Sequence, residues 1–288
     1  MTQATAPSAP TLVVQSLEAA AAEAAAIADL CGSEAPEPLG AHAFRLRGAR
    51  RRERVAAWCE TRRLDHAWLP DDRPRFGDLK LVAMDMDSTL ITIECIDELG
   101  GAAGRREEIS AITAQAMRGE IDYPESLRRR VALLAGMREG VLEDVYEEKL
   151  RLSPGAEKLV AACKQKGIKL LLVSGGFTFF TERLKQRLGL DETLSNVLEI
   201  ADGKLTGRVL GGIVDAGAKA AKFRQLAQRL GAAPEQTVAI GDGANDPRMM
   251  AEAGTSIAYR AKPVVRSNAS YALNYSGLDG VINLFPER

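Results

Sequence analysis

The chain contains few residues of the kinds that build zinc sites or disulfide frameworks. It has four cysteines and two histidines among 288 residues. Because the cysteines, at positions 31, 59, 95 and 163, form no CxxC pair, we expect neither a zinc site nor a Cys/His catalytic pair. Scattered, unpaired cysteines are typical of a reducing compartment, so the sequence predicts a cytoplasmic protein.

Long apolar runs and a one-sided charge are also lacking. The alanine-rich stretch 17–30 is interrupted by Glu18, Glu23 and Asp29, so it falls short of the roughly 18 apolar residues of a spanning helix. The N-terminus MTQATAPSAP has no basic region followed by an apolar run, and we expect no signal peptide. With 38 basic and 39 acidic side chains, the net charge of -1 indicates neither a nucleic acid nor a membrane as partner.

Aromatic residues are scarce as well, at 5%, but apolar residues make up 46% of the chain, enough for a sizeable core. We expect residues 1–10 to form a disordered tail. Strands are then predicted at 11–15, 42–46 and 65–69, and helices at 17–30 and 50–62. This alternation predicts a small α+β module over residues 11–70, followed by a polar, proline-containing linker over 71–78.

Arginines cluster within this module, at positions 45, 47, 50, 51, 52 and 54. Such a cluster can bind nucleic acid. We interpret it as a solvated helix face, because Glu53 is interposed and the net charge of the chain is close to zero.

From residue 79 onwards, short apolar strands alternate with helices. The expected strands are 79–84, 168–173, 237–240 and 256–259, and the expected helices are 155–165, 177–188, 216–230 and 246–253. The pattern predicts an α/β fold with a doubly wound parallel sheet over residues 79–288. Two insertions interrupt it, a helical cap at about 95–152 and a hairpin within 196–214 whose turn is Asp202-Gly203.

The strongest functional signal is Asp85-Met86-Asp87-Ser88-Thr89, which directly follows the first strand of this unit. Ligands of parallel sheets bind at the carboxyl ends of the strands, so both carboxylates are expected in that crevice. One carboxylate can attack phosphorus, and the other can protonate the leaving oxygen and then deprotonate water. Ser88 and Thr89 can donate to phosphate oxygens. Taken alone, the motif is also compatible with an acidic turn or a helix cap.

Two further polar segments follow strands. Ser174-Gly175-Gly176 comes after 168–173 and is typical of a phosphate-binding turn, although an ordinary strand-to-helix turn also favours these residues. Asp242, Asn245 and Asp246 come after 237–240 and add carboxylates of the kind that bind Mg²⁺. An acidic turn with a capping residue remains an alternative for this segment.

Lys219 completes the set, near the start of the helix 216–230, where it can bring positive charge to a phosphoryl group. By itself it is better interpreted as a surface lysine. Because all these elements follow strands or open helices of one domain, the sequence predicts a magnesium-dependent phosphatase site with Asp85 as nucleophile.

On these motifs, residues 79–285 resemble the haloacid dehalogenase superfamily and, within it, the phosphoserine phosphatase family. The superfamily pattern is DxDx[T/V], then Ser or Thr, then Lys, then an acidic GDxxxD. It is matched by Asp85 and Asp87, Ser174, Lys219, and Asp242 and Asp246. The resemblance implies that Asp87 is the general acid and base. It also implies that Mg²⁺ is held by Asp85, the backbone carbonyl of Asp87 and Asp242.

Two residues outside these motifs match the same family. Glu94 opens the stretch Glu94-Cys95-Ile96-Asp97-Glu98, where the family has a glutamate that contacts the amino group of the substrate. Arg130 lies in SLRRRV, where the family has an arginine that holds the substrate carboxylate. The resemblance assigns the remaining substrate and phosphate contacts to Ser174, Gly175, Lys219 and Asn245.

Helical spacing supports Arg130 over its neighbours. On an expected helix over 124–135, an apolar face is defined by Leu127, Val131 and Leu134, and Arg130 borders it. Arg129 lies on the opposite side, and a salt bridge within the cap remains the alternative for Arg130. Met117 and Tyr123 either line the cap interior or belong to the ordinary core.

The resemblance implies hydrolysis of O-phospho-L-serine to L-serine and phosphate, the last step of serine biosynthesis, through an aspartyl-phosphate. Hydrolysis of another small phosphate monoester and a phosphotransferase activity remain alternatives. A non-enzymatic amino-acid sensor is disfavoured by the complete acidic set. Residues 11–69 resemble the ACT-like module of some bacterial members, which implies a homodimer and serine as an effector.

Overall fold

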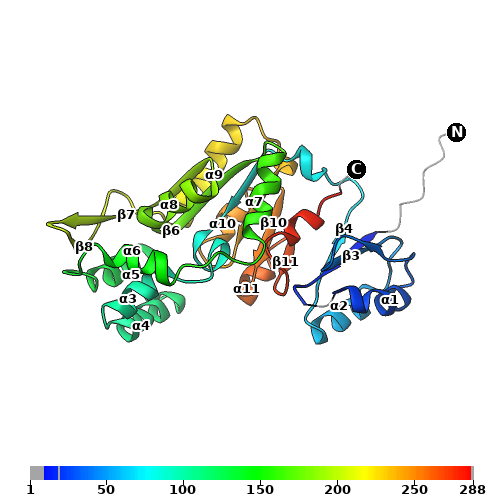
Figure 1. Cartoon of the computed structure of the whole chain (residues 1–288), viewed down its shortest axis with the longest axis horizontal. Helices are drawn as coiled ribbons and strands as arrows, with labels where there is room; N and C mark the ends of the chain where they lie inside the picture. The colour runs from blue at the N-terminus through cyan, green and yellow to red at the C-terminus, as the bar shows by residue number, and fades with distance from the viewer. Residues whose placement is uncertain (1–9, 19, 287–288) are drawn as a thin grey trace.

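The computed structural model describes residues 10–18 and 20–286. The tail predicted for residues 1–10 therefore lies, apart from Pro10, outside the described residues. Two sheets organise the described chain, a four-stranded sheet near the N-terminus and a seven-stranded sheet that carries the rest (Figure 1). In the described part of the chain no helix combines the length and apolar character needed to cross a membrane.

The N-terminal part has a βαββαβ order, as in ferredoxin-like folds. Its elements are β1 (Thr11–Gln15), α1 (Ala20–Cys31), β2 (Glu37–Pro38), β3 (Ala43–Leu46), α2 (Arg52–Thr61) and β4 (Asp65–Leu69). The strands pair antiparallel in the order β2-β3-β1-β4. The two-residue edge strand β2 was not predicted, because Glu37-Pro38 is too short to show an alternating pattern. That this part is an ACT-like module remains a prediction.

Asp65 at the start of β4 joins this small sheet to the C-terminal segment of the chain. Asp65 is 3% exposed, and its carboxylate accepts hydrogen bonds from the backbone N–H groups of Asn274 (2.7 Å), Tyr275 (2.9 Å) and Ser276 (2.8 Å). The hydroxyl of Ser276 donates a fourth, at 2.7 Å. The backbone of residues 274–276 is therefore held by a buried carboxylate of the N-terminal, four-stranded sheet.

We expect Asp65→Ala to lower the free energy of unfolding by about 3 kcal/mol, because it leaves buried N–H donors without their charged acceptor. Urea denaturation measures this loss. Asp71→Ala is the matched control, since Asp71 is exposed, and it should change the stability by less than about 0.5 kcal/mol. Equal stabilities of the two variants would show that the Asp65 contacts contribute nothing net.

The large sheet has the order β11-β10-β9-β5-β6-β7-β8, and every neighbouring pair is parallel except β7 and β8. The strands are β5 (Leu81–Met84), β6 (Lys169–Phe177), β7 (Glu192–Ala201), β8 (Lys204–Leu210), β9 (Thr237–Gly241), β10 (Thr255–Tyr259) and β11 (Tyr271–Leu273). The helices between and after them are α7 (Ala156–Gln165), α8 (Thr178–Leu188), α9 (Ala216–Arg229), α10 (Pro247–Met250), α11 (Pro263–Arg266) and α12 (Gly280–Asn283). The predicted α/β class and doubly wound parallel sheet are confirmed.

Three details of this sheet differ from the prediction. β7 begins at Glu192 and pairs with β6 before it forms the hairpin, and β11 was not predicted. The third detail is that β6 does not end at Val173 but continues to Phe177. The pairing register with β7 shifts there, because Val173 pairs with Leu194 whereas Phe177 pairs with Asn196. The predicted phosphate-binding turn, Ser174-Gly175-Gly176, therefore lies in an irregular end of the strand.

The helical cap is formed by α3 (Cys95–Ala102), α4 (Arg106–Met117), α5 (Tyr123–Ala132) and α6 (Val141–Glu148). It lies at the end of the molecule opposite the N-terminal sheet, beside the hairpin β7–β8 (Figure 1). The backbones approach closely at Gly207, where a Cβ would come within 3.2 Å of the backbone of Ala132. Glycine at this position, with its φ of +81°, therefore permits the cap to contact β8.

Candidate active site

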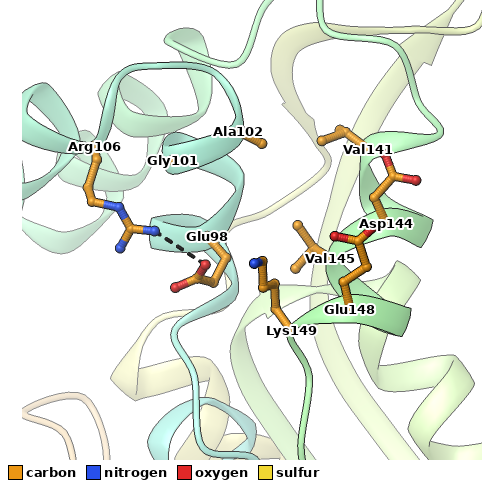
Figure 2. A pocket seen from close by; sticks show the side chains of 9 residues that line it. All are labelled: Glu98, Gly101, Ala102, Arg106, Val141, Asp144, Val145, Glu148 and Lys149. Atoms are coloured by element: carbon orange, nitrogen blue, oxygen red, sulfur yellow. Dashed lines mark hydrogen bonds and ion pairs between the residues drawn. The ribbon is translucent and has the colours of Figure 1, made fainter.

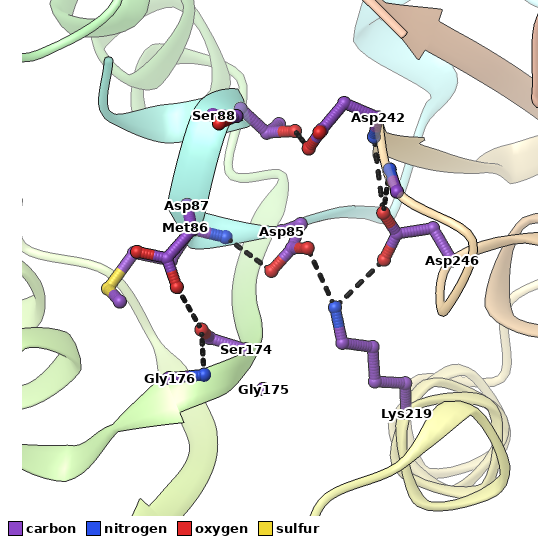
Figure 3. A network of polar contacts seen from close by, with 12 residues as sticks. Asp85, Met86, Asp87, Ser88, Ser174, Gly175, Gly176, Lys219, Asp242 and Asp246 are labelled. Carbon is purple, nitrogen blue, oxygen red and sulfur yellow. Dashed lines mark hydrogen bonds and ion pairs between the residues drawn. The ribbon is translucent and has the colours of Figure 1, made fainter. Parts of the chain in front are cut away.

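The predicted site residues meet at the carboxyl ends of three adjacent strands. β5 lies between β6 and β9, and the chain reaches these neighbours on opposite sides, which makes β5 a topological switch point. Asp85 follows β5, Ser174 lies near the end of β6, and Asp242 follows β9. Figure 3 shows that Lys219 reaches into the same cluster from α9.

Lys219 forms the centre of the cluster. Its ammonium lies 2.8 Å from Asp85 Oδ2 and 2.8 Å from Asp246 Oδ1, and its side chain is 0% exposed. The interpretation of Lys219 as a surface lysine is therefore wrong. Burial by itself lowers the pKa of Lys219, but the carboxylates of Asp246 and Asp85 outweigh it and raise the pKa above its ordinary value. The ammonium consequently stays charged beside the predicted nucleophile.

Asp246 ties the loop after β9 to this lysine. Its second oxygen, Oδ2, accepts from the backbone N–H groups of Asp242 (3.1 Å) and Gly243 (3.0 Å). Asp242 is fixed from the other side by Thr89, whose hydroxyl donates to Asp242 Oδ1 at 2.7 Å. Asp246 thus orients both Lys219 and the loop that presents Asp242.

Asp87 faces the turn at the end of β6. Its Oδ1 accepts from the backbone N–H of Cys95 at 3.0 Å, and its Oδ2 lies 3.4 Å from the hydroxyl of Ser174. The backbone turns sharply here, because Ser88 has the left-handed φ of 55°. Burial raises the pKa of Asp87, so this carboxyl holds a proton more readily than a free aspartate does. That property suits a general acid.

The carboxylates of Asp85, Asp242 and Asp246 could hold a metal ion, since ligand atoms of all three lie within 4.8 Å of one another. These three carboxylates face a single ammonium. Burial, and next the charge of Asp246, raises the pKa of Asp85 well above its ordinary value, and burial raises the pKa of Asp242 to about 6. A divalent cation offsets such excess negative charge, and carboxylate oxygens are the ligands that Mg²⁺ prefers.

This carboxylate set differs from the predicted ligand set in one member. Asp246 is in the cluster, whereas the carboxylate of Asp87 is not. Because both oxygens of Asp246 already bind Lys219 and backbone N–H groups, we assign it an orienting role. The predicted contribution of Asp87, through its backbone carbonyl, remains a prediction.

Arg130 is buried, whereas Glu94 is partly enclosed by its neighbours but remains exposed to solvent. Glu94 accepts a hydrogen bond from the hydroxyl of Ser88 at 2.9 Å, and burial raises its pKa to about 8. Arg130 is 9% exposed and donates from Nε to the backbone oxygen of Ser126 at 3.3 Å. Within the described residues no salt bridge engages Arg130, so the alternative of a salt bridge within the cap finds no support there. A buried guanidinium without a carboxylate partner is suited to bind an anionic group.

The turn itself leaves no room for a side chain at Gly175. A Cβ there would lie 2.0 Å from the hydroxyl of Tyr123 and 3.5 Å from Nδ2 of Asn245. Tyr123 donates to the backbone oxygen of Gly175 at 3.1 Å, so the cap contacts the predicted phosphate turn directly. Asn245 approaches the same glycine from the loop after β9.

The structure differs from the sequence analysis at Met117 and adds one residue, Asn196. Met117, expected in the cap interior or the core, is 63% exposed at the end of α4. Its sulfur lies 3.7 Å from the ammonium of Lys262. Asn196, which the sequence analysis did not single out, is buried in β7 and contacts the turn at Gly175 and Gly176. No local pattern marks it, because its partners are distant in the sequence.

A hollow of about 450 Å³ lies between α3 and α6 of the cap. Figure 2 shows the ion pair of Glu98 and Arg106, 3.2 Å apart, on one side and the charged side chains of α6 and Lys149 on the other. Its lining contains none of the predicted catalytic, substrate-binding or metal-binding residues. We therefore place the candidate active site at the strand ends and not in this hollow.

Residues 82–251 match the family model described as haloacid dehalogenase-like hydrolase. The match spans more than half of the chain, and the chain belongs to this hydrolase family. The predicted resemblance to the superfamily is thereby confirmed. Its phosphatase members supply the more specific likenesses.

A phosphoserine phosphatase from Polaromonas sp. is 55% identical over 215 residues, which are 73% of this chain and 91% of that protein. The unliganded crystal structure of a probable phosphoserine phosphatase from Vibrio cholerae is 38% identical, with a TM-score of 0.83, and covers 96% of this chain and 86% of that one. A structure described as a phospho-aspartyl intermediate analogue of phosphoserine phosphatase is 37% identical. Its TM-score is 0.68, and it covers 72% of this chain and 99% of that one.

Proposed function

We propose that the chain is a phosphoserine phosphatase that hydrolyses O-phospho-L-serine to L-serine and phosphate, the last step of serine biosynthesis. The observation that carries this proposal is the convergence of Asp85, Asp87, Ser174 and Lys219 at one edge of the sheet, under a cap that brings Arg130. The shared family and the 55% identity to a phosphoserine phosphatase support it.

The proposed reaction has two in-line displacements at phosphorus. Asp85 attacks, the bond to the serine oxygen breaks, and Asp87 gives its proton to that oxygen. Asp87 then takes a proton from the attacking water, and the bond between Asp85 and phosphorus breaks. Lys219 holds Asp85 and contributes positive charge, and Ser174 donates to a phosphoryl oxygen.

We propose Mg²⁺ as the cofactor, with Asp85, Asp242 and the backbone carbonyl of Asp87 as its protein ligands. When bound, Mg²⁺ neutralises negative charge on the phosphoryl group and on these carboxylates. The cluster supports a bound cation, because its three carboxylates, of Asp85, Asp242 and Asp246, are balanced by only the ammonium of Lys219 within the cluster.

The substrate is proposed from the charges that surround the phosphate site. Ionised Glu94 can pair with the ammonium of an amino acid, and Arg130 can hold its carboxylate bidentately. Gly175, Lys219 and Asn245 surround the phosphoryl group in this proposal, with Ser88 and Asp246 in supporting roles. A sugar phosphate offers neither charge, so it would leave the buried guanidinium of Arg130 without an anionic partner and Glu94 without a cation.

The proposal is tested by phosphate release from O-phospho-L-serine, O-phospho-L-threonine and a simple sugar phosphate, each with Mg²⁺ and with a chelator. We expect kcat/KM for phosphoserine to exceed that for the sugar phosphate by a factor of about 100 or more, because the buried Arg130 requires an anionic partner that, of the two, only phosphoserine supplies. The chelator should remove the activity. Metal-dependent release from the sugar phosphate alone would retain the mechanism and discard the substrate.

A phosphotransferase remains the second candidate, because an aspartyl-phosphate can pass its phosphoryl group to an alcohol other than water. Incubation of phosphoserine with excess labelled serine distinguishes the two. Label appearing in phosphoserine faster than phosphate is released would favour transfer.

We also propose the domain bounds 11–70, 71–78 and 79–288, and a cytoplasmic location. Support for the location comes from the four cysteines, which are all free and buried in the structure. For the N-terminal part we propose a homodimer with serine as effector. Serine titration of phosphate release, together with sedimentation of the full chain, tests this, and a monomer insensitive to serine would contradict it.

A further inference from the structure

The buried side-chain amide of Asn196 binds the backbone of the predicted phosphate-binding turn, Ser174-Gly175-Gly176. Asn196 is 1% exposed, and its Nδ2 donates to the backbone oxygens of Gly175 at 2.8 Å and Gly176 at 3.3 Å. Its Oδ1 accepts from the backbone N–H of Val214 at 2.8 Å. Because the nitrogen faces carbonyl oxygens and the oxygen faces an N–H, only one orientation of the amide satisfies these contacts.

This amide fixes the peptide plane between Gly175 and Gly176. In a trans peptide the C=O and the N–H point in opposite directions, so holding the carbonyl of Gly175 also directs the N–H of Gly176. That N–H donates to Ser174 Oγ at 2.8 Å. With an acceptor site of the hydroxyl occupied, the Ser174 proton is directed elsewhere, and Asp87 Oδ2 lies 3.4 Å away on the reacting side.

The same amide connects the turn to the segment that carries Lys219. Val214 directly precedes Asp215, whose side chain caps α9 by accepting from the N–H of Ala218 at 2.8 Å. Lys219 lies in the first turns of that helix. Asn196 therefore spans the ends of β6 and α9, the two elements that supply Ser174 and Lys219.

We propose that Asn196 is a positioning residue, which acts through the Gly175–Gly176 peptide to orient the Ser174 hydroxyl for donation to a phosphoryl group. The inference rests on the proposed function only in requiring that a phosphate occupies this turn. A buried asparagine that serves the fold alone would affect stability, whereas a positioning residue also changes phosphate affinity and kcat.

Asn196→Ala is expected to raise the dissociation constant of inorganic phosphate about tenfold, which corresponds to the loss of one well-formed hydrogen bond. Calorimetry in the presence of Mg²⁺ measures this constant directly. The kcat per folded molecule should fall by about tenfold or more, because the Ser174 hydroxyl loses its fixed direction. Asn196→Asp keeps the acceptor for Val214 but loses the donor, so it should show the same defect.

Thr181→Val is the matched control. Its hydroxyl shares a buried hydrogen bond of 2.7 Å with Ser195, the neighbour of Asn196, and has no contact with the turn. We expect this variant to lose stability while its phosphate affinity stays within about twofold of the wild type.

Phosphate affinity and kcat within about twofold of the wild type in the Asn196 variants would overturn the assignment. Should Asn196→Ala fail to fold, the isosteric Asn196→Asp decides by the same criterion. The proposed function is judged separately. Absence of phosphoserine hydrolysis by the wild type would remove that function, while the phosphate dissociation constants would still decide the role of Asn196.

Discussion

Asp85→Asn is expected to lower phosphate release from phosphoserine by a factor of at least about 10⁴, because a neutral amide cannot attack phosphorus. The loss should appear in kcat, since the variant has no nucleophile to form a covalent intermediate. Rapid acid quenching with radiolabelled substrate should trap a phosphorylated protein in the wild type and none in the variant.

Such a loss would reflect chemistry and not unfolding. Asparagine has nearly the shape of aspartate, and we expect Lys219 to keep Asp246, 2.8 Å away in this structure, as its charged partner. The melting temperature should therefore stay close to that of the wild type, and circular dichroism checks it. Asp71→Asn, an exposed carboxylate outside the site, is the control and should keep full activity. Retained phosphate release by Asp85→Asn would exclude Asp85 as the nucleophile.

Arg130→Ala is expected to lower kcat/KM for phosphoserine about a hundredfold or more, since truncating one partner of a buried charge pair costs about 2–5 kcal/mol. The effect should be mainly in KM, because the carboxylate of serine is remote from phosphorus. A substrate without a carboxylate, such as p-nitrophenyl phosphate, should be hydrolysed by the variant almost as well as by the wild type. The ratio of the two kcat/KM values is therefore the quantity to measure.

Arg129→Ala is the matched control on the same helix. Arg129 is exposed and pairs with Glu125 at 2.7 Å, so its removal should change kcat/KM by less than about twofold. If Arg130→Ala lowered kcat/KM for both substrates to a similar extent, Arg130 would support the cap and would not recognise the carboxylate. Loss of phosphoserine activity in Arg129→Ala would place the recognition on a different face of α5.

Local patterns along the chain were sufficient to predict most elements of the fold. The apolar runs before Asp85 and before Asp242 are β5 and β9, and Asp202-Gly203 does form the hairpin turn, with φ of 51° and 70°. Such features depend on residues a few positions apart, and the sequence shows those directly. β2 and β11 were missed because each is a short edge strand that depends on pairing with distant strands.

The same distinction applies to the site. The types of reacting groups and their order along the chain could be predicted from the sequence, because an aspartate pair after a strand already implies its chemistry. The burial of Lys219 could not, since its two carboxylate partners are 134 and 27 positions away, at Asp85 and Asp246. Met117 was expected in the cap interior or the core but lies at the surface. Its exposure depends on which helices pack against α4, and the local sequence does not show that.

The sequence by itself determined the fold class, the acidic motifs and the expectation of a phosphate-handling site. Tertiary structure alone decided that Asp246 orients Lys219, that Arg130 is buried without a salt bridge in the described part of the chain, and that Asn196 supports the turn at Gly175. Each of these outcomes depends on contacts between residues far apart in the chain. Their strength comes from burial, which lowers the local dielectric and leaves a polar group few alternative partners.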